Sequence, residues 1–305
     1  MAGRAATLVP VFDEVIQHDA PVPTWFGIGG RADMLARPRT EEELRDLLMA
    51  FAGQRIRVLG DGANLLVDDG GVDGLVLSLQ HLDKVDWGAG EKPIVMAQAG
   101  AKLPQLITES VRRGIAGIEG LAGIPASIGG AVVMNAGGKY GEIGTVIDRV
   151  RVFTKTGQEL SLPHDEIGFS YRHSGLDHCI IVSAYLSLRQ LPEAQQPALR
   201  ERLKEVMAYK KGSQPLADNS AGCVFKNAMF QGELTSAGKL IDQAGCKGLK
   251  VGGAEVSHVH GNFVVTRPGC TARDVIELME TVRGRVHEKF GVHLQNEVAV
   301  WRRGG

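Results

Sequence analysis

The stretch from Gly117 to Gly138 reads GIEGLAGIPASIGGAVVMNAGG and is the most unusual part of this sequence. It is dense in glycine, and Glu119 is its only charged residue. Glycine backbone can lie flat against a large planar or phosphorylated ligand, where a Cβ atom would obstruct. A long irregular loop is the alternative, but such loops are uncommon in compact domains unless they bind something. We interpret the run as a cofactor cradle.

Helix and strand signals alternate on both sides of this run. Thr40 and the three glutamates after it predict a capped helix to about Phe51. Thr156-Gly157 indicates a hairpin, and Ala272–Phe290 has the pattern of a long amphipathic helix. Other expected helices are 103–113, 198–211 and 238–244, and expected strands are 55–59, 65–67, 75–79, 94–97, 150–153, 159–162, 180–188 and 263–266. The pattern predicts an α+β protein with a boundary near residues 190–205.

Composition excludes several classes of protein. The 305 residues carry a formal net charge of −1, which gives no general attraction to nucleic acid or anionic membrane. No apolar run approaches the roughly 18–20 residues that span a bilayer. The four cysteines are scattered, which disfavours a zinc site or a disulfide framework and favours reduced thiols in the cytoplasm. His258 and His260 lack further ligands at suitable spacing, so no metal is expected.

A second glycine-containing loop, LGDGANL at residues 59–65, follows a predicted strand. Its backbone N–H groups could bind a phosphate, although a tight turn is an equal alternative. The loop is not G-x-G-x-x-G and no helix pattern clearly follows it. A doubly wound dinucleotide fold is therefore disfavoured.

Three further segments carry reactive side chains. In residues 169–174, FSYRHS, Arg172 could bind a carboxylate, although alone a surface ion pair is the simpler interpretation. In residues 219–227, NSAGCVFKN, small residues precede Cys223 and Lys226 follows it, although most isolated cysteines are structural. Residues 292–301 alternate in polarity and predict a strand, in which Glu297 is either paired or functional.

The order and spacing of these motifs closely resemble the UDP-N-acetylenolpyruvoylglucosamine reductase family, also called UDP-N-acetylmuramate dehydrogenases. The similarity begins at residues 24–30, TWFGIGG, and runs to the last residues. The segment 191–211 is short and lacks a tyrosine-bearing loop found in longer members, so the chain is similar to the shorter, second type of the family.

The resemblance implies an FAD-binding fold of the vanillyl-alcohol oxidase class with a C-terminal α+β domain. Residues 1–82, completed by a C-terminal strand at about 291–305, would form the first FAD-binding lobe. Residues 83–192 would form the second lobe, and 205–290 the substrate-binding domain. FAD would be bound non-covalently, with its pyrophosphate near 60–65 and its flavin against 123–136.

The resemblance also implies the reaction, which belongs to peptidoglycan precursor synthesis and hence to cell wall biogenesis, cell shape and division. NADPH would reduce FAD and leave, after which flavin N5 would pass hydride to C3 of the enolpyruvyl group. Cys223 would give a proton to C2, and Arg172 and Glu297 would stabilise the enediolate. Glu297 would have to carry a proton, which burial favours.

Residue roles carried over from the family fall into three groups. The implied catalytic residues are Arg172, Cys223 and Glu297. The implied cofactor-binding residues are Gly60, Asp61, Gly62, Ala63, Asn64, Leu65, Gly123, Ile124, Pro125, Ser127, Gly129, Gly130, Asn135, Ala136 and Gly137. The implied substrate-binding residues are Tyr171, Gln214, Lys226 and Asn227.

Two positions depart from the family pattern. Many members have serine where this chain has Cys223. A thiol with a reference pKa of about 8.5 is a stronger acid than an alcohol and can still be mostly protonated at neutral pH, so it suits proton donation if Lys226 does not drive it to thiolate. Ala228 stands where proline often follows the asparagine, a change expected to affect loop stiffness more than chemistry.

Two rival functions remain open. One is another FAD-dependent oxidoreductase of the same fold, such as an oxidase; many of these tether FAD through histidine or cysteine, which residues 60–65 and 117–138 lack. The other is a nucleotide-sugar binding module, which would not need Arg172, Cys223 and Glu297 together. A monomer in the cytoplasm with a nucleotide-sugar substrate, and with no nucleic-acid or membrane partner, is expected.

Overall fold

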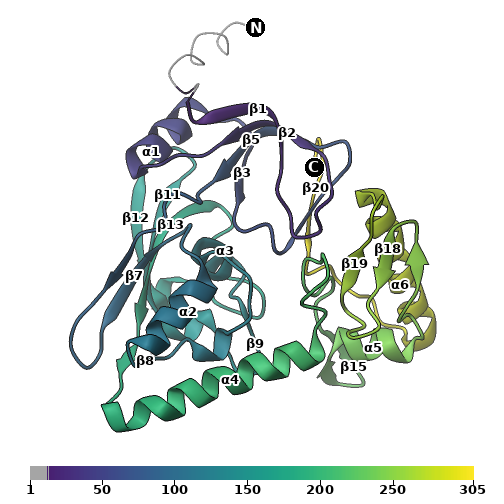
Figure 1. Cartoon of the computed structure of the whole chain (residues 1–305). Coiled ribbons are helices and arrows are strands. Elements are labelled where there is room, and N and C mark those ends of the chain that lie inside the picture. The colour runs from purple at the N-terminus through teal and green to yellow at the C-terminus, as the bar shows by residue number, and fades with distance from the viewer. Residues whose placement is uncertain (1–11, 13) are drawn as a thin grey trace, which may run out of the picture. The chain divides into compact units, whose positions relative to one another are not determined.

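The computed structural model describes residues 12 and 14–305, which form two compact units (Figure 1). Unit 1 contains the described residues up to Ala20 together with 33–61 and 74–208. Unit 2 contains residues 21–32, 62–73 and 209–305. The predicted three-domain division, 1–82, 83–192 and 205–290, stays a prediction.

Unit 1 holds two main sheets. The first has the order β1-β2-β5-β3, with β3 and β5 parallel, and its strands are β1 (Ile16–Pro21), β2 (Arg31–Ala36), β5 (Val72–Ser78) and β3 (Ile56–Leu59). The second is antiparallel with the order β12-β11-β13-β7-β6, formed by β12 (Glu159–Pro163), β11 (Ile147–Thr154), β13 (Cys179–Ser187), β7 (Ile94–Gln98) and β6 (Val85–Trp87).

Local sequence explains where the elements of unit 1 begin and end. Helix α1 (Glu41–Ala50) begins where the Thr40 hydroxyl accepts a hydrogen bond from the Glu43 N–H. Helix α2 (Leu103–Arg112) has proline in its first turn. The β11–β12 hairpin turns at Gly157, whose φ of 82° lies in the left-handed region that glycine adopts without strain. These predicted features are confirmed.

The core of unit 1 lies on the antiparallel sheet. Strand β13 is almost wholly buried, and helix α3 (Ile128–Val133) packs against it and against β7 (Figure 1). Helix α4 (Gln196–Ser213) passes from unit 1 into unit 2. The short elements of unit 1 are β8 (Ile115–Ala116), β9 (Gly137–Gly138), β10 (Gly141–Glu142), β14 (Arg189–Gln190) and 3₁₀ turns at Glu119–Leu121, Ile143–Val146, His164–Glu166 and Glu193–Gln195.

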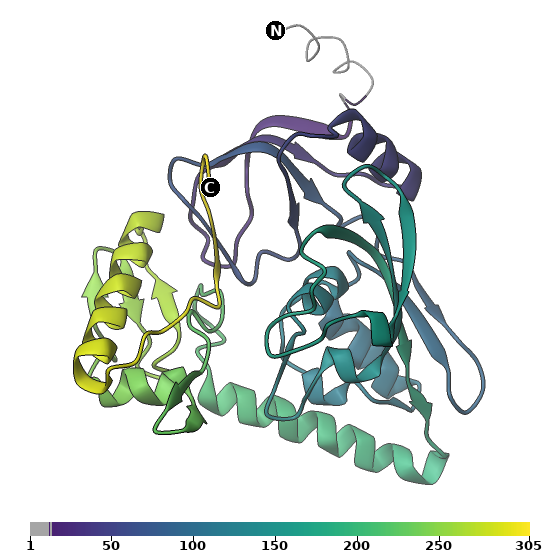
Figure 2. The same cartoon turned by 180° about the vertical axis from the view of Figure 1, so that it is seen from behind.

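Unit 2 is a small α+β assembly. A three-stranded sheet of order β17-β18-β19 is packed against α6, the yellow helix of Figure 2. Helix α6 has a Thr271–Asp274 capping box and ends at Gly291, whose φ is 68°. The elements of unit 2 are β4 (Leu65–Val67), β15 (Ala228–Phe230), β16 (Glu233–Thr235), α5 (Ala237–Gln243), β17 (Lys250–Val251), β18 (Ala254–Val256), β19 (Val264–Thr266), α6 (Ala272–Phe290) and β20 (Ala299–Trp301).

The predicted strand over 292–301 is wrong for most of its length. Only β20 is a strand, and it pairs in parallel with β4. Val292, Leu294 and Val298 are buried, but Asn296 breaks the alternation because it is exposed, and residues 295–298 make isolated backbone contacts with residues 224–226 and not a continuous ladder. Glu297 therefore lies in extended backbone outside the strand, and it is half-buried.

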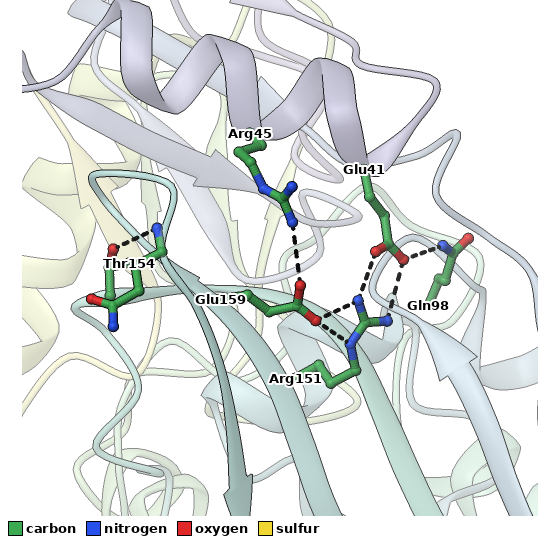
Figure 3. A network of polar contacts seen from close by, with 7 residues as sticks. Glu41, Arg45, Gln98, Arg151, Thr154 and Glu159 are labelled. Atoms are coloured by element: carbon green, nitrogen blue, oxygen red, sulfur yellow. Dashed lines mark hydrogen bonds and ion pairs between the residues drawn. The ribbon is translucent and has the colours of Figure 1, made fainter.

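A network of charged side chains joins α1 to the antiparallel sheet (Figure 3). Arg151 on β11 places Nη2 2.8 Å from Glu41 Oε2 on α1 and 2.7 Å from Glu159 Oε1 on β12. Gln98 on β7 donates to Glu41 (3.0 Å), and Arg45 pairs with Glu159 (3.2 Å). Burial alone would raise the pKa of Glu41, but the hydrogen bonds from Arg151 and Gln98 and the nearby arginine charges lower it overall.

We expect Arg151→Met to lower the free energy of unfolding by about 1–2 kcal/mol, between the values for exposed and buried pairs, because Glu41 would lose its main partner. The lowered pKa of Glu41 sets the pH dependence. Its contribution is present above the unfolded-state value of about 4.3 and is lost as pH falls through the folded-state pKa. Urea unfolding at pH 7 and below pH 4 measures both effects.

Lys204→Met is the matched control, because its pair with Glu201 is exposed (72% and 66%) and should contribute under about 0.5 kcal/mol. A stability difference between wild type and Arg151→Met that stays constant below pH 4 would contradict the assignment to Glu41.

Candidate active site

The two glycine-containing segments meet within unit 1. Gly60, at the end of β3, lies so close to the start of α3 that a Cβ atom there would be 3.0 Å from Ser127 Oγ and 3.7 Å from Gly130 Cα. The next residue, Asp61, forms an ion pair with Lys102, and Lys102 bridges by backbone to Ser127. A methyl group at Gly60 would crowd this junction and would require the Ser127 hydroxyl to shift, so glycine permits the closest approach of the two segments.

The surface of this junction suits a large, mostly uncharged ligand. Gly123, Ile124 and Pro125 are half-buried, as are Gly129 and Gly130 of α3, so this backbone is not folded away into the core. Ser127 accepts a hydrogen bond from the Gly130 N–H at 3.3 Å, which fixes the turn into α3. The close backbone approaches and the absence of charged side chains from 123–137 fit the flat, uncharged isoalloxazine ring of FAD.

Arg172 lies in a tight turn that is fastened to the glycine-rich run. Ser170 and His173 exchange backbone hydrogen bonds of 2.9 and 3.1 Å, which leaves Tyr171 and Arg172 at the tip. Asn135, fully buried, donates from Nδ2 to the Ser170 carbonyl (3.0 Å) and accepts at Oδ1 from the Gly144 N–H (3.0 Å). The predicted cofactor residue Asn135 therefore uses its side chain to hold the turn.

Arg172 and Asn135 both adopt left-handed backbone, as Asp19 and Gln231 do elsewhere in the described chain. Arg172 has φ of 56° and Asn135 has φ of 40°, and side chains other than glycine rarely adopt these values. The Ser174 hydroxyl donates to the Val133 carbonyl (2.9 Å), which fastens the other end of the turn. The Arg172 guanidinium carbon lies 5.1 Å from the Tyr171 ring centroid. The surrounding bonds thus fix a conformation that the turn would not choose alone.

Cys223 and Glu297 lie on two segments of unit 2 that pair through backbone hydrogen bonds, and Cys223–Lys226 is here called the cysteine segment. The Glu297 N–H donates to the Val224 carbonyl at 2.9 Å, and the Lys226 N–H donates to the Gln295 carbonyl at 2.8 Å. On its other side, Cys223 forms a backbone bridge with Phe263. Two predicted catalytic residues therefore lie on adjacent paired segments.

Asn64 links the glycine-containing loop at residues 59–65 to the backbone of Glu297. Its Nδ2 donates to the Glu297 carbonyl (3.0 Å), and its own carbonyl accepts from the Ala299 N–H (3.1 Å), where β20 begins. Gly62 has φ of 68°, and a Cβ there would lie 2.4 Å from the Pro23 carbonyl oxygen. Residues 62–65 are thus held between the TWFGIGG motif and the C-terminal residues of unit 2.

The predicted substrate-binding residues are divided between the two units. Asn227 accepts at Oδ1 from the Ala237 N–H at the start of α5 (3.2 Å), and Gln214 directly follows α4 and donates from its backbone to Lys210. Tyr171 and Arg172 belong to unit 1, whereas Gln214, Lys226 and Asn227 belong to unit 2. The predicted roles of all the site residues stay predictions.

Sequence reasoning missed three residues that shape the site. Lys102 pairs with Asp61, and the buried Asn262 accepts from the Phe225 N–H of the cysteine segment (3.0 Å). His260 Nδ1 accepts from the Asn262 N–H (3.1 Å). A signal for Asn262 was available, because an amide at the head of the apolar sequence Phe-Val-Val must find a partner when it is buried.

Two kinds of feature are absent from the described residues 12 and 14–305. No group of three or more His, Cys, Asp or Glu side chains there could hold a metal ion. No helix in that part of the chain is both long and apolar enough to cross a bilayer. His258 instead lies 3.2 Å from Glu255 as an ion pair when protonated.

We expect Cys223 to be the first of the four thiols to react with iodoacetamide. It is half-buried, whereas Cys179, Cys246 and Cys270 are buried. Burial raises the pKa of all three buried thiols, and together with the Asp274 charge it raises that of Cys270 to about 11, which lowers the reactive thiolate fraction.

Mass spectrometry of the native protein at pH 7.5 should therefore find one label, on Cys223, and denatured protein should carry four. Cys223→Ser should remove the fast label. Labelling of a buried cysteine at a comparable rate would contradict the burial described here.

Two family models match this chain. Residues 32–162 match the family model of an FAD binding domain, and residues 214–301 match that of the C-terminal domain of UDP-N-acetylenolpyruvoylglucosamine reductase. A crystal structure of UDP-N-acetylenolpyruvylglucosamine reductase from Thermus caldophilus is similar with a TM-score of 0.77 and 38% identity, covering 92% of this chain and 96% of that one. The predicted fold class is confirmed.

Curated relatives match over almost the same length. UDP-N-acetylenolpyruvoylglucosamine reductase from Moorella thermoacetica is 43% identical over 284 residues, which are 92% of this chain and 91% of that protein. The enzyme of the same name from Latilactobacillus sakei is 38% identical, covering 91% of this chain and 89% of that protein. From the order of its motifs, its fold and these relatives, the chain belongs to the UDP-N-acetylenolpyruvoylglucosamine reductase family.

Proposed function

We propose that this protein reduces UDP-N-acetylenolpyruvoylglucosamine to UDP-N-acetylmuramate, with NADPH as the hydride donor, as a cytoplasmic monomer in peptidoglycan precursor synthesis. The observation that carries the proposal is the hydrogen bond from the Glu297 N–H to the carbonyl of Val224, the residue that follows Cys223 (2.9 Å). A proton donor and a carboxyl group are held on neighbouring backbone segments there, inside the region that matches the family's C-terminal domain. A binding module would not need this pair.

The glycine segments would hold FAD without a covalent bond. Gly60, Ser127 and Gly130 form the junction that a Cβ would crowd, and Gly62–Leu65 would offer backbone N–H groups to the pyrophosphate. The run 123–137 would lie against the flavin. Bound FAD would supply the hydride that adds to C3 of the substrate.

Arg172 would bind the substrate carboxylate and stabilise negative charge that builds on it. A guanidinium presents two parallel donors to a carboxylate, and donors fixed in advance lose little in reorganisation when charge develops. Asn135 and Ser174 fasten the strained turn that carries Arg172, so the side chain starts from a restricted backbone. Such strain at a ligand-binding position is a common feature of active sites.

Glu297 would assist the same charge only as a protonated acid, because a bare carboxylate would repel the enediolate. Its backbone is fixed on both sides, by its own N–H to Val224 and by Asn64 to its carbonyl. The residue therefore has a defined position from which the carboxyl can donate.

Cys223 would deliver the proton to C2. One hydride at C3 and one proton at C2 together saturate the enolpyruvyl double bond and leave no charge behind. The thiol acts as a general acid, a role that typically contributes about 10²–10⁴-fold to the rate. It is regenerated when solvent returns the proton before the next turnover.

A comparison of wild type, Cys223→Ser and Cys223→Ala tests the proposal. We expect all three to bind FAD and to be reduced by NADPH at similar rates. Substrate turnover should persist with serine and fall about 10²–10⁴-fold with alanine, because alanine has no proton to give. Stopped-flow absorbance of FAD under anaerobic conditions separates the two half-reactions.

Other outcomes would favour the rivals. Undiminished turnover in Cys223→Ala would remove the thiol from the mechanism. Rapid peroxide formation without the enolpyruvyl substrate would indicate an oxidase. A colourless protein that cannot be reconstituted with FAD would indicate a binding module.

A further inference from the structure

Residues Ser257–Phe263, here called the support loop, contain the His258-Val259-His260 sequence and pack beside the cysteine segment. The loop closes on itself, since the Ser257 N–H donates to the Phe263 carbonyl (2.8 Å) and the Phe263 N–H to the His260 carbonyl (3.0 Å). Its side chains have no part in the proposed reaction. The loop nevertheless contacts the cysteine segment, since Phe263 forms a backbone bridge with Cys223.

The side-chain amide of Asn262 makes the two hydrogen bonds that a neighbouring β-strand would make with Phe225. Its Oδ1 accepts from the Phe225 N–H at 3.0 Å, and its Nδ2 donates to the Phe225 carbonyl at 2.7 Å. Its own carbonyl also accepts from the Val224 N–H at 3.0 Å. One residue thus satisfies three backbone groups of the cysteine segment, and it is 2% exposed, so water cannot replace these bonds cheaply.

His260 in turn fixes Asn262. Its Nδ1 accepts from the Asn262 N–H (3.1 Å), so the neutral ring carries its proton on Nε2. The ring packs edge-to-face on Phe263, with centroids 4.8 Å apart, and a Cβ at Gly238 would lie 2.9 Å from its Cε1. Burial, with the charge of Lys247, lowers the pKa of His260 and favours this neutral acceptor.

The opposite edge of the cysteine segment carries Glu297. Val224 donates to Asn262 on one side and accepts from Glu297 on the other. Phe225 bridges to Asn296 on that same far side. Displacement of Asn262 would therefore move the backbone that sets the spacing between Cys223 and Glu297.

We propose that Asn262, fixed by His260, is the positioning residue that holds Cys223 and Glu297 in register for proton transfer. The proposal rests on the proposed function for the meaning of that register. It assigns the histidine-containing loop a structural part in the reaction. Neither side chain is proposed to touch the substrate.

Asn262→Asp is the sharpest variant, because it keeps the shape and the acceptor for the Phe225 N–H. It replaces the donor to the Phe225 carbonyl with an oxygen that repels it. Loss of one hydrogen bond worth about 1.4 kcal/mol corresponds to a tenfold change in the equilibrium between the paired and the displaced segment. We expect alkylation of Cys223 by iodoacetamide to become about tenfold faster, a readout that needs no substrate.

The half-reactions provide the second readout. Displacement by about 1 Å can cost about 10²-fold in rate, so kcat for substrate reduction should fall 10- to 100-fold. FAD binding and flavin reduction by NADPH should stay within about twofold, since they do not use Cys223. Asn296→Asp is the matched control, because its Oδ1 accepts from Arg283 (2.6 Å), which a carboxylate does equally well.

Three results would overturn the proposal. The first is an alkylation rate and a kcat in Asn262→Asp that equal the wild-type values. The second is an equal loss of rate in both half-reactions, which would indicate a general structural role. If Asn262→Asp fails to fold, His260→Phe decides, since it keeps the packing and removes only the acceptor; it should show the same selective defect at about three- to tenfold. The third result is a wild-type alkylation rate and kcat in His260→Phe. Inactivity of the wild type with the enolpyruvyl substrate would instead refute the proposed function, and the alkylation result would still stand.

Discussion

The arrangement of unit 2 depends on pairing the backbone of a segment that is not part of any sheet. Val224, Phe225 and Lys226 are largely buried or half-buried, so their N–H and C=O groups need partners inside the protein. Gln295 and Glu297 provide them on one side and Asn262 on the other. A slip of one residue would turn each side chain to the opposite face, and Cys223 would no longer face its present surroundings.

In unit 1, an asparagine side chain also pairs with the backbone of a segment that lies outside any sheet. Asn135 holds the Arg172 turn through one amide, as Asn262 holds the cysteine segment through another. Asparagine suits both places because its amide offers a donor and an acceptor in one plane, the pattern of a peptide group. It also tolerates left-handed backbone better than most residues, which the φ of 40° at Asn135 requires.

Much of the fold could be predicted because its signals are local. The Thr40 cap, the Gly157 hairpin and helix α6 are set by residues within a few positions of each other. The C-terminal strand was predicted too long because alternation shows which side chains are buried and not which backbone has a partner. Only Ala299–Trp301 have β4 beside them.

The residues proposed for the candidate site are suggested by sequence motifs, whereas the residues that support them carry no such signal. Arg172, Cys223 and Glu297 stand in recognisable sequences. Asn262 was missed because its partner, the Phe225 backbone, lies far away in the chain and carries no side-chain signature. For Asn135, the family resemblance implies a cofactor contact, which stays a prediction, and its side-chain bonds to the Ser170 carbonyl and the Gly144 N–H could not be foreseen from the sequence.

The pairing of β20 with β4 also constrains the order of events during synthesis. The two strands lie near opposite ends of the sequence, so β4 must wait for Ala299–Trp301 to leave the ribosome before its ladder can form. Contacts between such distant residues close late and slow the search for the native state. The hydrogen bond from Asn64 to the Glu297 carbonyl likewise forms only after residue 297 has been synthesised. The nascent chain therefore carries β4 without its parallel partner for most of translation, although Gly60, Asp61 and Gly62 already have their neighbours at residues 127, 102 and 23.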